Sequence, residues 1–533
     1  MSTALERLKQ KIAARKEAEA LIQRASHGGI EYNLRQNEFI KLATAGKSCV
    51  LIGAAGTGKT TCMKGTITSL IQAGVSQIDT TDHKYLTSGA HGIICVSFTR
   101  RAVANLRRVV SSDMKQNCIT IHKLLEYRPT ERIVTDPITG QTKTSRIFLP
   151  NRNQINPLPS GIQTIIIDES SMVSTELFEQ ILNALPYEVQ FIFLGDIQQL
   201  PPVFGSAVLG FKMLEHPVVE LTEVYRQALE SPIIRLAHRI LSGNPIPSTE
   251  FNEWKFPGQL TIHPWKKKIS SDMATVTAAS FFSSAYTSGA YNPDEDIILI
   301  PYNKSFGTDE LNKYIASHIA KSENRVVHEV IAGFEKLYFS VGERVLFERE
   351  DAIITAIRPN GYYAGKRPQK AATTMDYWGH HPSLTGSANS DNPDDLTDID
   401  DMLNNMSLSS SNKDEERVRR ASHVVTVTLR DTGEEVSLET ASELNSLLLA
   451  YSLTVHKSQG SEWRKVFLVL HQSHATMIQR ELLYTGVTRA REELYIICEP
   501  ESFVKGITSQ RIKGNTLEEK AEFFKGKLEA AAP

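Results

Sequence analysis

The chain contains 533 residues, a length that exceeds one hydrophobic core and predicts roughly three or four domains. Hydrophobic residues make up 41% and charged residues 23%, as in ordinary globular proteins, and no apolar run approaches the roughly 18 residues of a membrane span. The sequence therefore predicts a multidomain globular enzyme and excludes residence in a membrane.

The N-terminus and the cysteines indicate a reducing compartment. Residues 1–27 carry alternating charges and lack the apolar middle of a secretory signal, so we expect a solvated helix there. The cysteines lack paired spacing and predict packing rather than disulfides or a zinc site. They are Cys49, Cys62, Cys95, Cys118 and Cys498.

The net charge of −2 conceals a local asymmetry. Phosphate binding uses clustered Lys and Arg, so a near-neutral chain at first argues against a nucleic-acid partner. Residues 391–416 are strongly acidic, however, and the rest of the chain is therefore net basic. The overall charge does not exclude DNA.

Short apolar strands recur along the chain with amphipathic stretches between them. The first group starts at residues 48–60, where a strand runs through a glycine-rich turn into a helix, and continues at 92–98, 164–170 and 189–196. The second group comprises 296–302, 447–455, 465–471 and 493–498. Buried parallel strands with helical crossovers are implied, so we predict two α/β domains.

Two β inserts interrupt this pattern. Residues 131–150 alternate polar and apolar side chains around a Pro and a Gly, which predicts a β-hairpin. Residues 339–351 and 422–439 resemble strands and flank a segment rich in Ser, Asn and Asp. We therefore predict a small β module that carries a long disordered loop from about 367 to 421.

The first glycine-rich turn predicts a phosphate-binding loop. Residues 53–60 read GAAGTGKT and fit the pattern G-x-x-x-x-G-K-[ST]. The glycines let backbone N–H groups surround phosphates, Lys59 reaches the β- and γ-phosphate oxygens, and the Thr60 hydroxyl ligates Mg²⁺. The turn therefore predicts binding of a nucleoside triphosphate with Mg²⁺.

Polar residues follow two later strands of the first group. Asp168 and Glu169 end an apolar strand, at the sheet edge where open α/β sheets bind ligands, so Asp168 can hold Mg²⁺ and Glu169 can polarise water. This adjacent Glu favours hydrolysis over transfer to a substrate hydroxyl. Gln199, in the segment GDIQQLPPV, can sense the γ-phosphate.

Six motifs in chain order resemble those of a known family. They are GAAGTGKT (53–60), IIIDES (165–170), GDIQQLPPV (195–203), LTEVYRQ (221–227), LTVHKSQGSEW (453–463) and LLYTGVTRAR (482–491). The set resembles the superfamily 1 helicases, specifically the branch that contains RecD and the phage Dda helicase. The resemblance spans residues 32–498, and the acidic loop has no counterpart in the family pattern.

The resemblance implies an α/β fold with two RecA-like P-loop motor domains, each built on a parallel sheet. Motor domain 1 is expected at 28–230, after the charged helix at 1–27, and carries a β-hairpin insert at 126–158. Motor domain 2 is expected at 231–330 and 440–533, interrupted by an SH3-like β insert at 331–439.

The resemblance also implies a composite ATP site. Gln36 matches the glutamine that grips the adenine edge, which suits a carboxamide because it both donates and accepts hydrogen bonds. Arg226 and Arg489 match two arginines that close on the γ-phosphate and stabilise the charge that develops there. The implied catalytic residues are Lys59, Asp168, Glu169, Gln199, Arg226 and Arg489.

Binding residues follow from the same motifs. The nucleotide would be held by Gln36, Gly53, Ala54, Ala55, Gly56, Thr57, Gly58, Lys59, Thr60, Thr61 and, at the ribose, Glu462. Mg²⁺ would be held by Thr60 and Asp168. Contacts to the nucleic-acid backbone would come from Thr99, Arg100, Thr120, His122, Asn303, Thr454, His456 and Lys457. A solvated basic helix face is the alternative reading of Arg100, Arg101, Arg107 and Arg108.

The implied function is an ATP-dependent helicase that translocates 5′ to 3′ on single-stranded DNA and unwinds duplex DNA in replication, recombination or repair. Two alternatives stay open: an RNA helicase, or an ATP-gated DNA-binding subunit of a recombination complex that does not unwind by itself. The hairpin at 131–150 is either a pin that separates the duplex or a plain surface hairpin.

The expected partners are single-stranded DNA and duplex junctions. The acidic loop would recruit single-strand-binding, replisome or recombination proteins, mimic DNA electrostatically, or serve as a disordered linker. We expect a monomer in the cytoplasm of a bacterium or a phage-infected cell.

Overall fold

The computed structural model places most of the chain. It describes residues 31–78, 86, 89–135, 142–203, 205–224, 230–265, 270–304, 306–333, 335–347, 350–363, 420–430 and 433–531, without the side chains of 129–148. The helix expected at 1–27 lies outside the described residues, as do the hairpin tip at 136–141 and the expected loop up to residue 419.

The chain divides into two compact units, which we describe separately. Unit 1 comprises Met1–Glu126, Pro150–Arg235 and Ile512–Pro533. Unit 2 comprises Tyr127–Leu149 and Leu236–Arg511. No helix in the described part of the chain is both long enough and apolar enough to cross a membrane.

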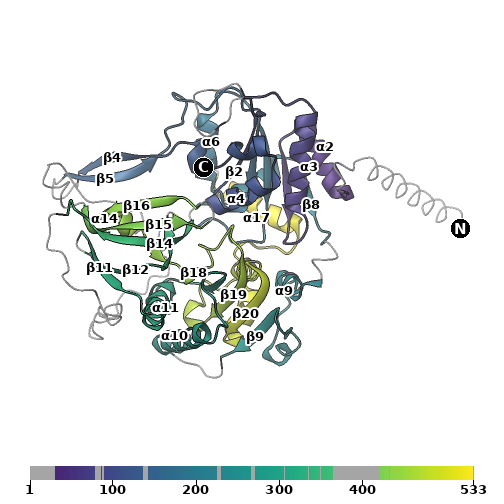
Figure 1. Ribbon diagram of the computed structural model, residues 1–533. Helices are drawn as coiled ribbons and strands as arrows, with labels where there is room; N and C mark the ends of the chain where they lie inside the picture. The colour runs from purple at the N-terminus through teal and green to yellow at the C-terminus, as the bar shows by residue number, and fades with distance from the viewer. Residues whose placement is uncertain are drawn as a thin grey trace, which may run out of the picture. The chain divides into compact units, whose positions relative to one another are not determined.

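Unit 1 is built on a six-stranded parallel sheet in the order β3-β2-β6-β7-β1-β8 (Figure 1). Its strands are β1 (Cys49–Gly53), β2 (Ile93–Ser97), β3 (Cys118–Thr120), β6 (Thr164–Asp168), β7 (Gln190–Gly195) and β8 (Val218–Leu221). The central strands are buried almost throughout, because helices cover both faces of the sheet. The parallel strands predicted in this half of the chain are confirmed.

Helices α2 (Leu34–Thr44), α3 (Lys59–Gln72) and α4 (Arg100–Val109) share one apolar core with one face of this sheet. On the alternate face, the ring of Phe178 from α6 (Thr175–Ala184) contacts Phe191 and Phe193 of β7. Helix α7 (Val208–Glu215) packs against α17 (Leu517–Ala531), and α5 (Ile121–Leu124) follows β3.

Unit 2 contains a five-stranded parallel sheet in the order β18-β10-β19-β20-β9. Its strands are β9 (Leu260–Pro264), β10 (Asp296–Ile300), β18 (Ser452–Thr454), β19 (Trp463–Leu470) and β20 (Ala490–Cys498). One face shares an apolar core with α10 (Ser271–Thr287) and α11 (Thr308–Ser322). The remaining helices are α15 (Arg480–Val487) and α16 (Pro500–Thr508), and the unit boundary falls within α9 (Pro232–Leu241).

The predicted β module of unit 2 has a core of its own. Its five-stranded antiparallel sheet has the order β16-β15-β14-β13-β17, and a separate hairpin pairs β11 with β12. The strands are β11 (Val327–Ala332), β12 (Glu335–Ser340), β13 (Arg344–Phe347), β14 (Glu350–Pro359), β15 (Arg420–Leu429), β16 (Glu435–Thr440) and β17 (Leu448–Leu449), with α14 (Ala441–Asn445) after β16. The SH3-like assignment stays a prediction.

Two boundaries differ from those expected from the sequence. The apolar run at 447–455 is divided between β17, which joins the insert sheet, and β18, which joins the motor sheet. The C-terminal residues 512–533 belong with unit 1, since Phe524 of α17 lies against Gly210 of α7. The local periodicity of the sequence does not reveal either boundary, because contacts between distant segments decide both.

The hairpin insert consists of β4 (Arg128–Thr135) and β5 (Thr142–Leu149), paired in continuous antiparallel register. The predicted hairpin is therefore present. It belongs to unit 2, although it is inserted between elements of unit 1 in the sequence.

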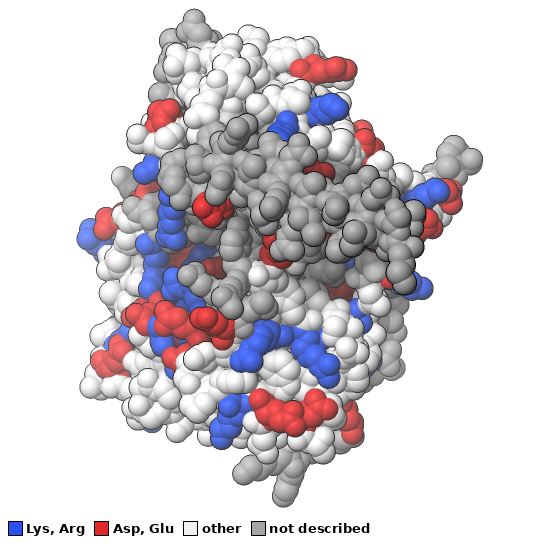
Figure 2. All heavy atoms as spheres, turned by 90° about the vertical axis from the view of Figure 1, so that its right-hand side faces the viewer, with Lys and Arg blue, Asp and Glu red and all other residues white. Residues whose placement is uncertain are grey.

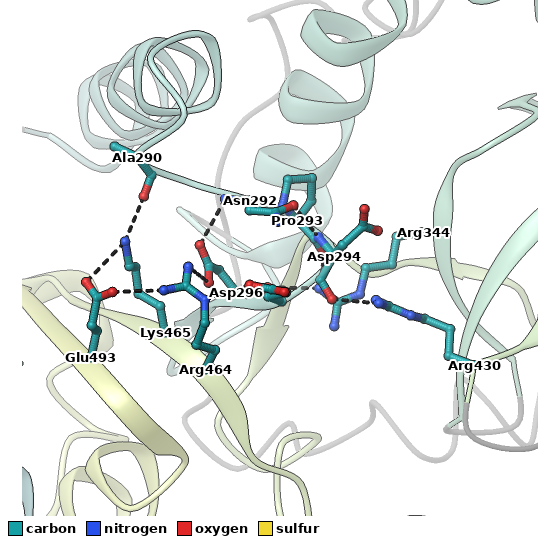
Figure 3. A network of polar contacts seen from close by, with 11 residues as sticks. Ala290, Asn292, Pro293, Asp294, Asp296, Arg344, Arg430, Arg464, Lys465 and Glu493 are labelled. Atoms are coloured by element: carbon teal, nitrogen blue, oxygen red, sulfur yellow. Dashed lines mark hydrogen bonds and ion pairs between the residues drawn. The ribbon is translucent and has the colours of Figure 1, made fainter.

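A buried ionic network joins the β module to the motor sheet of unit 2 (Figure 3). The Arg344 guanidinium of β13 forms two hydrogen bonds to the Asp351 carboxylate, at 2.9 and 2.7 Å. Its third nitrogen donates to the carbonyl oxygens of Asp296, at 2.9 Å, and Pro293. One guanidinium thus ties the insert to the segment that enters β10.

The same segment is held on its other side by strands β19 and β20. Arg464 donates to the Asp296 carboxylate at 2.7 Å and to Glu493 at 2.8 Å. Lys465 pairs with Glu493 at 3.2 Å and donates to the Ala290 carbonyl at 3.1 Å. Fully paired charges of this kind can remain buried because each has a partner in place of water.

Replacing Arg344 by Met should lower the free energy of unfolding of unit 2 by about 3 kcal/mol, because Asp351 then stays buried without its bidentate partner. Urea unfolding followed by tryptophan fluorescence measures this, since all four tryptophans fall within residues 236–511. Lys336→Met is the control: its ion pair with Glu329 leaves the lysine 51% exposed, so its loss should cost less than about 1 kcal/mol. Equal effects of the two substitutions would contradict a structural role for the network.

Candidate functional site

The predicted phosphate-binding loop connects β1 to α3. Gly56 and Gly58 have φ angles of +80° and +84°, which favour glycine. A Cβ atom on Gly53 would lie 2.4 Å from the Thr57 hydroxyl oxygen, so this position also excludes a side chain. Gly58 immediately precedes α3, and the N-terminus of a helix offers unpaired N–H groups and a positive dipole end. The loop is therefore suited to an anion such as phosphate.

Lys59 and Thr60 lie in the first turn of α3. The Lys59 ammonium donates to the Gly53 carbonyl at 2.5 Å and to the Ala54 carbonyl at 3.2 Å, so it lies across the loop. The Thr60 side chain is exposed at the helix N-terminus. The remaining predicted loop residues, Ala55 and Thr61, flank the same turn. Phosphate oxygens could take the place of the two carbonyls as acceptors for Lys59.

Asp168 and Glu169 lie where β6 ends. Burial and, to a smaller extent, the neighbouring Glu169 carboxylate raise the pKa of Asp168, the Lys59 ammonium opposes the shift, and the resulting pKa is about 7. Asp168 retains some solvent contact, so protein atoms around the carboxyl rather than complete enclosure cause this desolvation. A nearby divalent cation would stabilise the ionised form.

Glu169 has a strained backbone. Its φ and ψ angles of 51° and 41° lie in the left-handed region, which residues other than glycine rarely adopt. One carboxylate oxygen, Oε2, is buried without a hydrogen-bond partner. Strain and an unsatisfied acceptor on one residue are typical of a functional site.

Gln199 lies in the turn after β7, the strand between β1 and β6. The backbone N–H of Gln199 donates to the Asp196 carbonyl at 3.1 Å, and the Asp196 carboxylate accepts from the Gln198 N–H at 3.0 Å. Gln199 is 5% exposed, and its Oε1 atom is buried without a partner. The turn thus holds an amide oxygen ready for a ligand beside the acidic pair.

These residues fit a magnesium nucleotide. Parallel strands β1, β7 and β6 bring Lys59, Asp168, Glu169 and Gln199 to one sheet edge. The edge offers one cation for phosphate and three side chains whose oxygens can accept from water or bind Mg²⁺. Burial of unsatisfied oxygens is costly unless a ligand or water supplies the missing partner.

Gln36 lies beside the loop, but its amide is already engaged. Its Oε1 accepts from the Asn33 N–H at 3.1 Å while the Asn33 side chain accepts from the Gln36 N–H at 2.9 Å, which forms a capping box on α2. Its Nε2 donates to the Gly58 carbonyl at 3.4 Å, and the residue is 0% exposed. In this structure Gln36 links α2 to the phosphate loop, and the adenine contact stays a prediction.

Of the two predicted arginines, only Arg489 lies in the described part of the chain; Arg226 lies outside it. Arg489 is 5% exposed in unit 2, and its guanidinium donates to the carbonyls of Thr485, at 3.0 Å, and Ser461, at 3.1 Å. Glu462, the next residue after Ser461, is exposed. These bonds fix the guanidinium next to the predicted ribose contact.

The three threonines predicted to contact nucleic acid share one local structure. Each lies at the carboxyl end of a parallel strand and begins the following helix or turn. The hydroxyl oxygens of Thr99, Thr120 and Thr454 accept from the backbone N–H three residues later, at 3.2, 3.1 and 3.2 Å. Accepting this bond leaves the hydroxyl proton available for a phosphate oxygen.

The other predicted contacts differ in their surroundings. Arg100 and Lys457 are exposed, and His122 packs edge-on against Phe98 with ring centroids 5.5 Å apart. Burial and, to a smaller extent, the charge of Arg511 lower the pKa of His456 to about 4, so its imidazole is neutral at physiological pH. Neutral imidazole can donate a hydrogen bond to phosphate but adds no charge.

Asn303 lies in a tight turn after β10. It is 7% exposed, and its Oδ1 is buried without a partner. A Cβ atom on Gly307 would lie 2.0 Å from the Asn303 carbonyl carbon, and Phe306 has φ +58°. The turn is stabilised by His474, whose Nε2 lies 2.8 Å from the Phe306 carbonyl oxygen. Sequence motifs did not indicate His474, because the contact joins residues 168 positions apart.

The prediction that the cysteines serve packing agrees with the structure, in which all five are buried and unpaired. Two of them nevertheless face each other, since Cys95 of β2 is the register partner of Cys118 of β3. Their spacing in the sequence gives no indication of this proximity.

Comparisons with known proteins agree with the motifs. Residues 36–205 match an AAA domain, and residues 449–497 match a UvrD-like helicase C-terminal domain. The chain is 25% identical over 473 residues to the ATP-dependent RecD2 DNA helicase of Deinococcus radiodurans. This match covers 88% of this chain and 49% of that protein. It is 23% identical over 479 residues to the ATP-dependent DNA helicase dda of Enterobacteria phage T4, covering 84% of this chain and 93% of that one.

Among solved structures, the Pif1 helicase from Bacteroides in complex with ADP-AlF3 and ssDNA is 16% identical, with a TM-score of 0.44 and coverage of 93% of this chain and 97% of that one. At this score the superposition adds no argument about the fold. The chain spans about half the length of the RecD2 helicase, at 49%. Its ordered motifs, its two domain matches and these relatives agree in making the chain similar to the RecD/Dda branch of the superfamily 1 helicases.

Proposed function

We propose that the protein is a DNA helicase that hydrolyses ATP with Mg²⁺, translocates 5′ to 3′ on single-stranded DNA and separates the duplex ahead of it. The observation that carries the proposal is the edge of the unit 1 sheet, where Lys59, Asp168, Glu169 and Gln199 meet beside a phosphate-binding loop. The relatives named as ATP-dependent DNA helicases support DNA as the substrate.

In the proposed reaction, Thr60 and Asp168 would hold Mg²⁺, which would neutralise charge on the phosphates. Lys59 binds the terminal phosphate oxygens. Glu169 orients and polarises the attacking water through its unsatisfied oxygen, while the Gln199 amide contacts the same region. Arg226 and Arg489 would stabilise the charge on the phosphoryl group as it is transferred to water.

Coupling to the DNA strand follows from the sheet register. Ser97, the last residue of β2, is the register partner of Asp168, and Thr99 lies two residues beyond it. A shift at the metal-binding end of β6 would therefore reach the strand-binding segment through one pair of neighbouring residues. We propose that Thr120 holds the same strand in unit 1 and that Asn303, Thr454 and Lys457 hold it in unit 2.

In this proposal, strand binding rests on local groups rather than on a broad basic surface. On the face in Figure 2, Lys and Arg alternate with Asp and Glu in small clusters, and neither sign covers a broad area of the described surface. Helix N-termini and threonine hydroxyls bind phosphate without a continuous basic surface. The acidic segment at 391–416 would contact replication or recombination proteins rather than DNA, because like charges repel.

Substituting Glu169 by Gln should lower DNA-stimulated ATP hydrolysis by about 100-fold or more while nucleotide binding persists, because the amide cannot act as a base.

The test uses duplexes with either a 5′ or a 3′ single-stranded tail, of DNA or RNA. We expect wild type to displace strands only from the 5′-tailed DNA. Glu179→Gln, at an exposed position of α6, is the control and should match wild type.

Other outcomes of this assay favour the alternatives. Preference for RNA duplexes would indicate an RNA helicase, and ATP hydrolysis without displacement would indicate an ATP-gated binding subunit. Failure of every nucleic acid to stimulate hydrolysis would reject the proposed function.

Mg²⁺ affinity should fall about tenfold between pH 8 and pH 6, because Asp168 is protonated below its pKa of about 7 and the proton competes with the metal. Competition of Mg²⁺ with bound Mn²⁺, followed by manganese paramagnetic resonance on the ADP-bound protein, measures this affinity. Asp168→Asn should bind the metal weakly and lose most of the pH dependence. If the pH dependence of metal affinity is unchanged in this variant, a group on the nucleotide rather than Asp168 causes it.

Replacing residues 136–141 of the hairpin by a Gly-Ser segment should abolish strand displacement and spare DNA-stimulated ATP hydrolysis if the hairpin is the separation pin. Both activities are measured on the same tailed duplex. Equal loss of both activities, or loss of neither, would refute the pin role.

A further inference from the structure

Helix α17 belongs to unit 1, although the chain reaches it directly from the last segment of unit 2. The helix begins with a capping box: the Thr516 hydroxyl accepts from the Glu519 N–H at 3.2 Å, and the Glu519 carboxylate accepts from the Thr516 N–H at 3.4 Å. Lys520 is 1% exposed, and its ammonium donates to the Ile512 carbonyl at 3.4 Å. These bonds fix the position at which the helix starts.

Phe524 of α17 occupies a hollow on α7 that a glycine provides. The Phe524 ring is 2% exposed and packs edge-on against Phe211, with ring centroids 5.3 Å apart. A Cβ atom on Gly210 would lie 2.2 Å from the Phe524 ring, so a side chain at this position would force the ring to move. Phe524 is therefore seated at one defined place on α7.

Helix α7 also contacts the turn that begins at Glu169. A short 3₁₀ turn, Ser170–Met172, follows Glu169 directly and ends at Val173. The backbone N–H of Val208, the first residue of α7, donates to the Val173 carbonyl at 2.8 Å. The start of α7 is thereby bonded to the end of this turn.

Side chains add a second contact between α7 and the turn, at the end of β7. The hydroxyl of the fully buried Ser170 donates to the Leu194 carbonyl at 2.8 Å. A Cβ atom on Gly195 would lie 2.7 Å from a methyl carbon of Leu209 and 2.9 Å from the Ser170 hydroxyl oxygen. Ser170 and Leu209 therefore approach the same glycine, and Leu209 immediately precedes Gly210 in α7.

The backbone of Glu169 requires support of this kind. A residue with a side chain keeps φ and ψ angles of 51° and 41° only when the surrounding structure holds it there. The contacts of α7 with Ser170 and Val173 supply part of that constraint, and Phe524 determines where α7 lies. The direction of the Glu169 carboxylate therefore depends on a helix that is distant in the sequence.

We propose that Phe524 is a positioning residue for ATP hydrolysis, which holds α7 and, through α7, the turn that directs Glu169 toward the attacking water. This inference rests on the proposed ATP-dependent function. It assigns a part in hydrolysis to a helix that lies beyond the six sequence motifs, the last of which ends at residue 491. If α17 only covered an apolar surface, loss of the Phe524 ring would lower stability without a specific effect on the reaction.

The first measurement is steady-state ATP hydrolysis by the full chain with saturating single-stranded DNA. Phe524→Ala should lower kcat about tenfold and change KM for ATP less than about twofold, because the nucleotide still binds while Glu169 is misaligned. Leu528→Ala is the matched control, since Leu528 lies on the same helix and is 48% exposed. This control should keep the wild-type kcat.

The second measurement tests whether the effect passes through Glu169. In a chain that already carries Glu169→Gln, the addition of Phe524→Ala should lower the residual kcat less than about twofold, because no carboxylate remains to be misaligned. A purely structural role predicts a different result. Partial unfolding would reduce the active fraction by the same factor in both backgrounds.

A complementary pair of substitutions decides the question if Phe524→Ala does not fold. Gly210→Ala places a methyl group against the ring and should lower kcat. Adding Phe524→Leu to that chain makes room for the methyl group, so the double variant should recover kcat to within about threefold of wild type. Wild-type kcat in Gly210→Ala, or no recovery in the double variant, would overturn the inference.

The inference is also overturned if Phe524→Ala hydrolyses ATP as fast as Leu528→Ala, or if its effect is the same with and without the Glu169 carboxylate. In each of these cases wild type still hydrolyses ATP on DNA, so the proposed function stands. If no nucleic acid stimulates hydrolysis by wild type, the proposed function itself fails. The two failures are therefore distinguishable in one set of assays.

Discussion

The parallel pairing of strands is the constraint on which the candidate site depends. Each crossover returns the chain to the same end of the sheet, so segments far apart in sequence leave their strands along one edge. That edge also receives the N-termini of α3 and α4, with their unpaired N–H groups. Phosphate binding, metal binding and strand binding can share one edge because the strand order alone brings the chain segments and the helix N-termini together there.

The second unit needs a different constraint, because a β module is inserted between the strands of its motor sheet. The module has its own apolar core, so packing alone would let it form separately from the sheet. Arg344 links the module to the sheet, because it donates hydrogen bonds to the Asp351 carboxylate of the module and to backbone carbonyls of the segment that enters β10. Buried ionic groups contribute little net stability when fully paired, but they penalise misplaced arrangements strongly. The network therefore fixes where the insert attaches.

Much of the fold and of the phosphate site could be predicted from sequence because their signals are local. A glycine-rich turn after an apolar strand identifies β1 and α3, and paired carboxylates after another strand identify the end of β6. The attachment of β17 to the insert sheet and of α17 to unit 1 could not be predicted, since packing across long separations decides both. The hydrogen bonds of the Gln36 side chain could not be predicted from the sequence either. Its sequence position fits a helix cap and an adenine contact equally well, and only the backbone geometry shows that the cap uses its amide oxygen.

This engagement has a consequence for how a site can select its ligand. A fully buried amide with both ends bonded is rigid, which suits it to hold α2 against the phosphate loop. While these two bonds hold, both polar atoms of the Gln36 side chain are engaged by the protein, so the predicted adenine contact would require one of the bonds to break. Burial therefore gives Gln36 a structural role in this structure: it fixes the position of α2 relative to the loop that the sequence motif assigns to phosphate.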